Sequence, residues 1–232
     1  MKIEVLSNAD GVAKRAAAII AEAARTAVAA RGRFAFAVSG GRTPWQMLRA
    51  LADEDLPWPA MHVMQVDERV APRGDPDRNL THLSESLLEH APLPAQNVHA
   101  MPVELPDLAA AVASYAATLG TVAGTPPTLD LVHLGLGPDG HTASLVPGDP
   151  VLGVTDADVA LAGPYQGRRR MTLTYPAINR ARRILWVVTG ADKTAMLARL
   201  RNGDRSIPGG CVSQEQALLL ADQAALGRGE AK

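Results

Sequence analysis

An aspartate and a histidine, Asp139 and His141, stand two residues apart in a glycine-rich stretch that follows an apolar run. Histidine exchanges a proton readily near neutral pH, and a nearby carboxylate can orient its ring and stabilise its charged form. Because only Gly140 separates the two residues, we expect both side chains to reach one cavity. The pair predicts general acid–base chemistry, either attack of water on an ester or lactone carbonyl or proton transfer at a sugar carbon.

A second stretch with chemical character is SGGRTP, residues 39–44, between an apolar run and a segment with helical spacing. The glycines Gly40 and Gly41 let backbone amides turn towards an anion, and Ser39 and Thr43 add hydroxyl groups. A helix that begins here would also favour phosphate at its N-terminus. The stretch lacks the G-K-[ST] ending of a P-loop. It predicts a phosphate-binding loop or, as the alternative, an ordinary turn between strand and helix.

Charged residues at three further places are candidates for the same site. Arg69 ends the triplet that starts at Asp67, directly after a predicted strand, where an arginine can stabilise an oxyanion. One of the three arginines at 168–170 can turn inward ahead of a predicted strand. Lys193 lies where a helix is expected to begin, and a positive charge there opposes the helix dipole, which favours a functional role.

Cofactor and metal sites are not indicated. Residues 135–140 match G-x-G-x-x-G, but Pro147 follows the last glycine too soon for the full helix of a dinucleotide site. None of the 6 histidines is spaced as in a metal motif, and the single cysteine, Cys211, has no partner for a disulfide. We therefore expect no metal and no cofactor.

Length and charge limit the classes of protein. The chain has 232 residues, 47% of them hydrophobic, with 23 basic and 24 acidic residues and a net charge of −1. Such a balance gives no global attraction to nucleic acid or anionic membranes, so any anion site must be local. No apolar run approaches the roughly 18 residues that cross a bilayer, and the N-terminus lacks the apolar region of a signal peptide. We expect a cytoplasmic protein.

Strand and helix patterns alternate along the chain. Strands are expected at 2–6, 34–38, 61–66, 97–100, 129–134, 159–162, 171–174, 184–188 and 211–213. Helices are expected from about 10 to 31 and at 45–51, 79–90, 107–119, 190–200 and 214–226. The alternation predicts an α/β fold: a single Rossmann-like domain over 1–232, with an open, mostly parallel sheet and helices on both faces.

Taken together and in order, three stretches resemble the 6-phosphogluconolactonase family, within the wider group that includes glucosamine-6-phosphate deaminases. They are SGGRTP at 39–44, DERVAP at 67–72 with Asn79, and GLGPDGHTASLVP at 135–147. The strand RMTLT at 170–174 and GADK at 190–193 are also similar to the family. The likeness spans nearly the whole chain.

The resemblance implies a function and a role for each site residue. The reaction would be hydrolysis of 6-phospho-D-glucono-1,5-lactone to 6-phosphogluconate, the second step of the oxidative pentose phosphate pathway. His141 would be the general base, Asp139 its orienting partner and Arg69 a ligand of substrate or oxyanion. Asp67 would contact sugar hydroxyls. The residues implied to hold the 6-phosphate are Ser39, Gly40, Gly41, Thr43, Arg170 and Lys193.

Two details favour the lactonase branch over the deaminases. The deaminases usually have an aromatic residue where this chain has Arg69, and they follow Asp-Gly-His with a segment that contains a glutamate, where this chain has TASLV at 142–146. Arg78 and Val146 depart from the usual serine and phenylalanine of the family.

An amino-sugar-phosphate deaminase or isomerase and a non-catalytic sugar-phosphate sensor remain alternatives. The expected partner is a small sugar-phosphate lactone, with no nucleic acid or membrane, in a monomer or small homo-oligomer.

Overall fold

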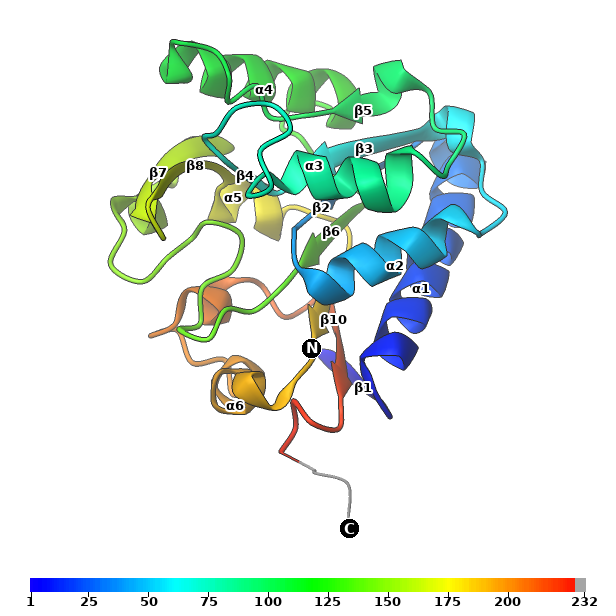
Figure 1. Ribbon diagram of the computed structural model, residues 1–232, viewed down its shortest axis with the longest axis vertical. Helices are drawn as coiled ribbons and strands as arrows, with labels where there is room; N and C mark the ends of the chain where they lie inside the picture. The colour runs from blue at the N-terminus through cyan, green and yellow to red at the C-terminus, as the bar shows by residue number, and fades with distance from the viewer. Residues whose placement is uncertain (228–232) are drawn as a thin grey trace.

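A computed structural model describes residues 1–227, and its centre is a seven-stranded parallel sheet in the order β1-β10-β9-β6-β2-β3-β5 (Figure 1). The strands of this sheet are β1 (Lys2–Leu6), β2 (Phe34–Val38), β3 (Met61–Gln65), β5 (Val98–His99), β6 (Leu131–Leu134), β9 (Ile184–Val188) and β10 (Ala217–Asp222). The helices are α1 (Ala9–Arg31), α2 (Arg42–Ala52), α3 (Asn79–Leu83), α4 (Leu108–Ala123), α5 (Tyr175–Asn179) and α6 (Thr194–Arg201). The predicted α/β fold with an open, mostly parallel sheet is confirmed.

The sheet separates two hydrophobic cores, because alternate side chains of each buried strand point to opposite faces. On β2, Phe34 and Phe36 pack with α1 and α2, whereas Ala35 and Ala37 pack on the side of α4. Figure 1 shows α1 and α2 together at one side of the molecule and α4 at another. A strand covered on both faces is apolar throughout, which is why the short runs of β2 and β9 could be recognised from sequence.

Local signals set the ends of the longest helix, α1. The side chain of Asn8 accepts a hydrogen bond from the amide of Gly11 at 2.9 Å and caps the first turn. Gly32 ends the helix in the left-handed conformation, with φ of 73°, and its amide bonds back to Val28. The helix predicted from about 10 to 31 is thus observed at Ala9–Arg31.

A second, three-stranded antiparallel sheet lies beside the large one, in the order β4-β8-β7. Its strands are β4 (Asp67–Arg69), β7 (Val159–Tyr165) and β8 (Arg168–Leu173). The triplet 67–69 follows the end of β3, as predicted, but it also forms a strand of its own that was not predicted. The three arginines were expected ahead of a strand and lie within β8, so that placement is wrong. The two segments are paired strands, with Asp67 opposite Thr172 and Arg69 opposite Arg170. This pairing carries Arg170 next to the charged triplet.

The prediction for the C-terminal region is wrong. We expected a strand at 211–213 and a helix at 214–226, but β10 runs from Ala217 to Asp222 and pairs in parallel with both β1 and β9. The run ALLLA is compatible with a helix or a buried strand when it is read alone. The segment 217–222 is a strand because it lies between β1 and β9, where its backbone groups form hydrogen bonds on both sides.

The other boundaries differ less. The expected helix at 79–90 is α3 followed by a π-helical turn, Ser84–Leu88, and the expected helix at 190–200 is a 3-10 turn, Ala191–Lys193, followed by α6. Within residues 1–227, no helix combines the length and apolar character needed to cross a membrane. The single domain predicted over 1–232 includes 228–232, which lie outside the described residues, and it stays a prediction.

The chain order of the strands reverses between β2 and β6. From β2 the chain continues outward to β3 and β5, whereas β6, β9 and β10 follow one another in the other direction. In open α/β sheets, ligands bind beyond the carboxyl ends of the strands at such a switch point. The loops that leave these two strands are those that begin at Ser39 and Gly135, the two stretches singled out in the sequence.

Candidate active site

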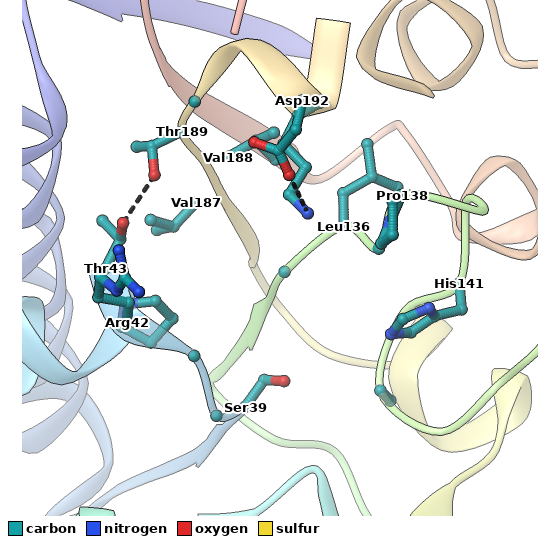
Figure 2. A pocket seen from close by; sticks show the side chains of 18 of the residues that line it. Ser39, Arg42, Thr43, Leu136, Pro138, His141, Val187, Val188, Thr189 and Asp192 are labelled. Atoms are coloured by element: carbon teal, nitrogen blue, oxygen red, sulfur yellow. Dashed lines mark hydrogen bonds and ion pairs between the residues drawn. The ribbon is translucent and has the colours of Figure 1, made fainter. Parts of the chain in front are cut away.

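A cavity of about 670 Å³ lies beyond the carboxyl ends of β2, β6, β9 and β10. Figure 2 shows Ser39, Arg42 and Thr43 on one side of it, with His141 reaching in from the opposite side and Thr189 at the end of β9. Nine of the ten predicted site residues line this cavity: Ser39, Gly40, Gly41, Thr43, Asp67, Arg69, His141, Arg170 and Lys193. Asp139 does not line it, so the expectation that Asp139 and His141 both face the cavity is wrong.

Asp139 lies behind His141 and holds its ring. One carboxylate oxygen, Oδ1, is 2.6 Å from the ring atom Nδ1 of His141 and also accepts a hydrogen bond from the amide of His141 at 3.1 Å. A carboxylate accepts hydrogen bonds, so the neutral ring carries its proton on Nδ1 and leaves Nε2 as the basic nitrogen. The hydrogen bonds from His141 lower the pKa of Asp139 against the opposing effect of burial.

The loop around His141 is closed by backbone bonds and leaves no room for a side chain at Gly137. The amide of Gly137 donates to the carbonyl of His141 at 2.8 Å. A methyl group at Gly137 would lie 2.0 Å from Nδ1 of His141, far inside van der Waals contact. Gly140 has φ of 84°, a conformation that favours glycine. Gly137 therefore leaves space for the imidazole ring of His141, and Gly140 allows the conformation of the loop. These glycines are not part of a nucleotide fingerprint.

Arg69, Asn79 and Asp67 form a bonded group on the wall of the cavity. The guanidinium of Arg69 donates to the side-chain oxygen of Asn79, whose amide nitrogen donates to the backbone oxygen of Asp67 at 2.9 Å. The carboxylate of Asp67 also accepts from the hydroxyl of Ser144 at 2.6 Å. Arg69 is thus fixed in place, while Asp67 has less free bonding capacity for a ligand than the sequence suggested.

Glu68, between these residues, has no exposed side-chain surface and supports the group from behind. Its carboxylate accepts hydrogen bonds from the backbone amides of Arg69 and Asn79, each at 2.8 Å, and forms an ion pair with Arg78 at 3.0 Å. Both partners of this ion pair are buried, and such pairs fix geometry even where they add little net stability. Arg78, which departs from the usual serine of the family, therefore takes part in positioning Arg69.

Of the three consecutive arginines, Arg170 is the one that turns to the cavity. Arg170 is 4% exposed, Arg169 points to solvent, and Arg168 forms ion pairs with Asp75 and Asp77. Burial, followed by the neighbouring positive charge of Arg69, lowers the pKa of Arg170. Two guanidinium groups held close together are stabilised by an anion between or beside them. The part of the cavity next to Arg69 and Arg170 therefore favours a negatively charged ligand.

The loop at 39–43 has the features of an anion site. Gly41 precedes the first turn of α2 with no side-chain cap, so amides of that turn remain open to a ligand. The hydroxyl of Thr43 is 2.6 Å from that of Thr189, which joins this loop to the end of β9. A side chain at Gly40 would meet Asn79 at 2.0 Å, so the loop and the Arg69 group pack directly together.

Lys193 lines the cavity, but its charge is already paired. Its ammonium group lies 2.9 Å from the carboxylate of Asp192, which also lines the cavity. Counting side chains around the cavity gives four cations, Arg42, Arg69, Arg170 and Lys193, against three carboxylates, Asp67, Asp192 and Asp222. Among these four cations, Lys193 alone forms a short ion pair in the described part of the chain, since Arg170 is 4.0 Å from Asp67 and no ion pair joins Arg42 or Arg69 to a carboxylate.

Tyr165, Thr189 and Asp222 are residues of the site region that the sequence did not indicate. Tyr165 donates a hydrogen bond to Asp139 at 3.2 Å, and Asp222 accepts one from the amide of Gly190 at 3.1 Å. All three stand at strand ends without any motif around them, so only the order of strands reveals them. Among residues 1–227 there is no group of three His, Cys, Asp or Glu side chains arranged to hold a metal ion.

Comparison with known proteins gives concordant matches. The model of the family described as "Glucosamine-6-phosphate isomerases/6-phosphogluconolactonase" matches residues 7–220. A 6-phosphogluconolactonase from Nostoc sp. is 38% identical over 202 residues, covering 85% of this chain and 84% of that protein. The crystal structure of 6-phosphogluconolactonase from Thermotoga maritima superposes with a TM-score of 0.85 at 26% identity, covering 95% of this chain and 98% of the other.

A third similarity shows that the fold does not choose the reaction. A monomeric glucosamine-6-phosphate deaminase also superposes with a TM-score of 0.85, at 17% identity, covering 98% of this chain and all of the other, 100%. At that identity the likeness concerns the fold alone. The chemistry must therefore be argued from the residues of the site.

Proposed function

The chain belongs to the family of glucosamine-6-phosphate isomerases and 6-phosphogluconolactonases, and on this basis we propose that it hydrolyses 6-phospho-D-glucono-1,5-lactone to 6-phospho-D-gluconate. The protein is then a carboxylic ester hydrolase that acts in the second step of the oxidative pentose phosphate pathway. Water is the only second reactant, so the proposal includes no cofactor. A cytoplasmic location and a monomer or small homo-oligomer stay predictions.

The observation that carries the proposal is the position of His141. Its ring lines the same cavity as the loop at 39–43 and the buried Arg170, and its Nδ1 is bound by Asp139. A lactone whose phosphate lay at the loop would have its carbonyl in a cavity that contains a base and arginines. Base, oxyanion partner and anion site are the parts that hydrolysis of a phosphorylated lactone requires.

The mechanism follows from this arrangement. Nε2 of His141 removes a proton from a water molecule, and the oxygen of that water attacks the lactone carbonyl to form a tetrahedral oxyanion. Arg69, held by Asn79, stabilises the negative charge on that oxygen. The bond from the carbonyl carbon to the ring oxygen then breaks, and the protonated imidazole returns its proton to the departing ring oxygen. Asp139 stays ionised and keeps the ring oriented.

Binding of the substrate is assigned to the rest of the cavity. We propose that Ser39, Gly40, Gly41 and Thr43 hold the 6-phosphate together with Arg170 and Lys193. The backbone amides in the first turn of α2, which no side chain caps, support this role, and so does the weakly compensated charge of Arg170. Contacts from Asp67 to sugar hydroxyls are a lesser part of the proposal, because Ser144 and Asn79 already occupy its carboxylate.

The test uses freshly generated 6-phosphogluconolactone, followed with and without the protein because the lactone also hydrolyses spontaneously. The non-phosphorylated lactone and glucosamine 6-phosphate are assayed beside it. Faster loss of the phosphorylated lactone, with little effect on the non-phosphorylated one, is the expected result. No acceleration above the spontaneous rate would contradict the proposal.

Two other functions have distinct outcomes in the same assay. Release of ammonia from glucosamine 6-phosphate would support a deaminase, and ligand binding without any turnover would support a sugar-phosphate sensor. The residues after His141 argue against the deaminase, since Thr142 to Val146 include no carboxylate. The hydrogen bond between His141 and Asp139 argues against the sensor, since ligand binding alone does not need an oriented general base.

A further inference from the structure

Tyr165, at the end of β7, contacts both the pair of Asp139 and His141 and the arginine Arg170. Its hydroxyl donates to Oδ2 of Asp139 at 3.2 Å and lies 3.5 Å from Nδ1 of His141. Its ring stands edge-on to the imidazole, with 5.1 Å between the ring centroids. On another side, the guanidinium of Arg170 lies 5.1 Å from the centroid of the Tyr165 ring and donates to the Tyr165 carbonyl at 3.3 Å.

We propose that Tyr165 is a positioning residue that fixes the carboxylate of Asp139, and through it the tautomer of His141, while its ring supports Arg170. This inference rests on the proposed function and deepens it by adding a residue that acts through the base. It requires no contact between Tyr165 and the substrate, and Tyr165 does not line the cavity.

The need for a second anchor follows from the exposure of Asp139. The Asp139 side chain is 36% exposed, and both of its hydrogen bonds with His141 are made by Oδ1, so without Tyr165 the second oxygen, Oδ2, would be held by solvent alone. His141 bonds to Oδ1 and Tyr165 bonds to Oδ2, so each carboxylate oxygen of Asp139 has its own hydrogen-bond partner. Burial, followed by the negative charge of Asp139, raises the pKa of Tyr165, so the hydroxyl keeps the proton that it donates.

The backbone after Tyr165 shows how this position is maintained. Gln166 and Gly167 both have positive φ, 53° and 78°, and form the tight turn between β7 and β8. A non-glycine residue rarely adopts this conformation, so the surrounding structure must hold Gln166 there. The turn brings Tyr165 and Arg170 together across adjacent strands, with Tyr165 paired to Arg168. The same hairpin thus carries the support of the base and the anion-binding arginine.

The experiment compares Tyr165→Phe with the wild type by two independent readouts. The first is the nitrogen NMR spectrum of the histidine rings at a pH where they are neutral, which distinguishes the Nδ1–H from the Nε2–H tautomer. The signals of His141 are identified as those lost in His141→Gln. We expect a single Nδ1–H tautomer in the wild type and a mixture of both in Tyr165→Phe, because Asp139 loses its second anchor.

The second readout is lactone turnover. In Tyr165→Phe we expect kcat to fall roughly tenfold with KM nearly unchanged, since the ring beside Arg170 remains. Tyr165→Met removes hydroxyl and ring together, and we expect it to raise KM as well. Tyr175→Phe is the matched control: it likewise deletes one tyrosine hydroxyl, but that hydroxyl donates to the backbone oxygen of Pro208 at 2.9 Å, and Tyr175 does not line the cavity. The control should keep the wild-type tautomer and turnover.

The outcomes separate this inference from the proposed function. A wild-type tautomer in Tyr165→Phe would overturn the positioning role, whether kcat falls or not. A changed tautomer in Tyr165→Phe, with no lactonase activity in the wild type, would support the positioning role and reject the proposed reaction. A changed tautomer together with the loss of kcat supports both.

Discussion

The backbone amide of Ser39 donates a hydrogen bond of 3.2 Å to the ring atom Nδ1 of His133. Ser39 begins the loop after β2, and His133 lies within β6, so this bond joins the two strands between which the chain order reverses. The bond requires an unprotonated Nδ1, and the His133 side chain has no exposed surface. A neutral histidine in the core therefore holds the proposed phosphate loop against the strand that leads to His141.

Stability should depend on pH through His133. Burial lowers the pKa of its ring from 6.5 to about 3, so the folded protein leaves it neutral while the unfolded chain takes up a proton below pH 6.5. Its contribution to stability is complete above pH 6.5 and is lost as the pH falls towards 3. Between pH 7 and 5, we expect the wild type to lose about 2 kcal/mol more unfolding free energy than His133→Asn. Urea unfolding at the two pH values measures this, and equal losses in the two proteins would contradict it.

Replacing His141 should remove catalysis but not binding. In His141→Ala, we expect kcat for the phosphorylated lactone to fall by roughly 10²- to 10⁴-fold, as is typical when a general base is lost. The loop at 39–43 is untouched, so calorimetry should still detect binding of 6-phosphogluconate. His90→Ala, at a histidine outside the cavity, is the control. Wild-type turnover by His141→Ala would exclude His141 from the mechanism.

The space beside the imidazole gives a second test of the same geometry. Gly137→Ala places a methyl group 2.0 Å from Nδ1 of His141, where the bond to Asp139 is made. We expect the ring to move and kcat to fall by at least roughly tenfold, because misplacement of a catalytic group by about 1 Å is costly. Gly153→Ala adds the same methyl group in open space and should keep full activity. Equal rates for the two variants would show that the seat of His141 is adaptable.

Arg170 should increase the affinity for the phosphorylated lactone without stabilising the ligand-free protein. In Arg170→Met, we expect KM for the phosphorylated lactone to rise roughly 10- to 100-fold, which corresponds to loss of a charge-assisted contact. Turnover of the non-phosphorylated lactone should change little. Because Arg69 and burial disfavour the charge of Arg170, the melting temperature without ligand should not fall. Arg169→Met, at the exposed neighbour, is the matched control for all three measurements.

Glu68 should be the carboxylate on which the wall of the cavity depends. Glu68→Gln turns an amide group towards backbone donors and leaves the buried Arg78 without its fully buried acid partner, so we expect a loss of about 3–5 kcal/mol in unfolding free energy. Urea unfolding measures the loss. Glu104→Gln, which removes the other acid of Arg78 at a side chain 37% exposed, should cost much less. A similar loss in both variants would show that burial of Glu68 is not decisive.

Several features of the protein were determined by the sequence alone, because they depend on neighbouring residues. Asn8 and Gly32 mark the ends of α1 by capping, and the apolar run of β2 marks a strand buried on both faces. The glycines around Asp139 and His141 predicted a loop that carries an acid beside a base, and the two residues are bonded as expected. The α/β fold class followed from the alternation of such local patterns.

Other features were decided only by the tertiary structure, because they join segments far apart in the chain. The place between β1 and β9 makes 217–222 a strand, although the same residues read as a helix. The pairing of β4 with β8 selects Arg170 from three equal arginines and brings it to Asp67. Tyr165 meets Asp139 across 26 positions of sequence, and no periodicity or motif encodes such a contact. Hydrogen bonds and packing between distant strands determine these positions, whereas a local pattern reports only what its own neighbours favour.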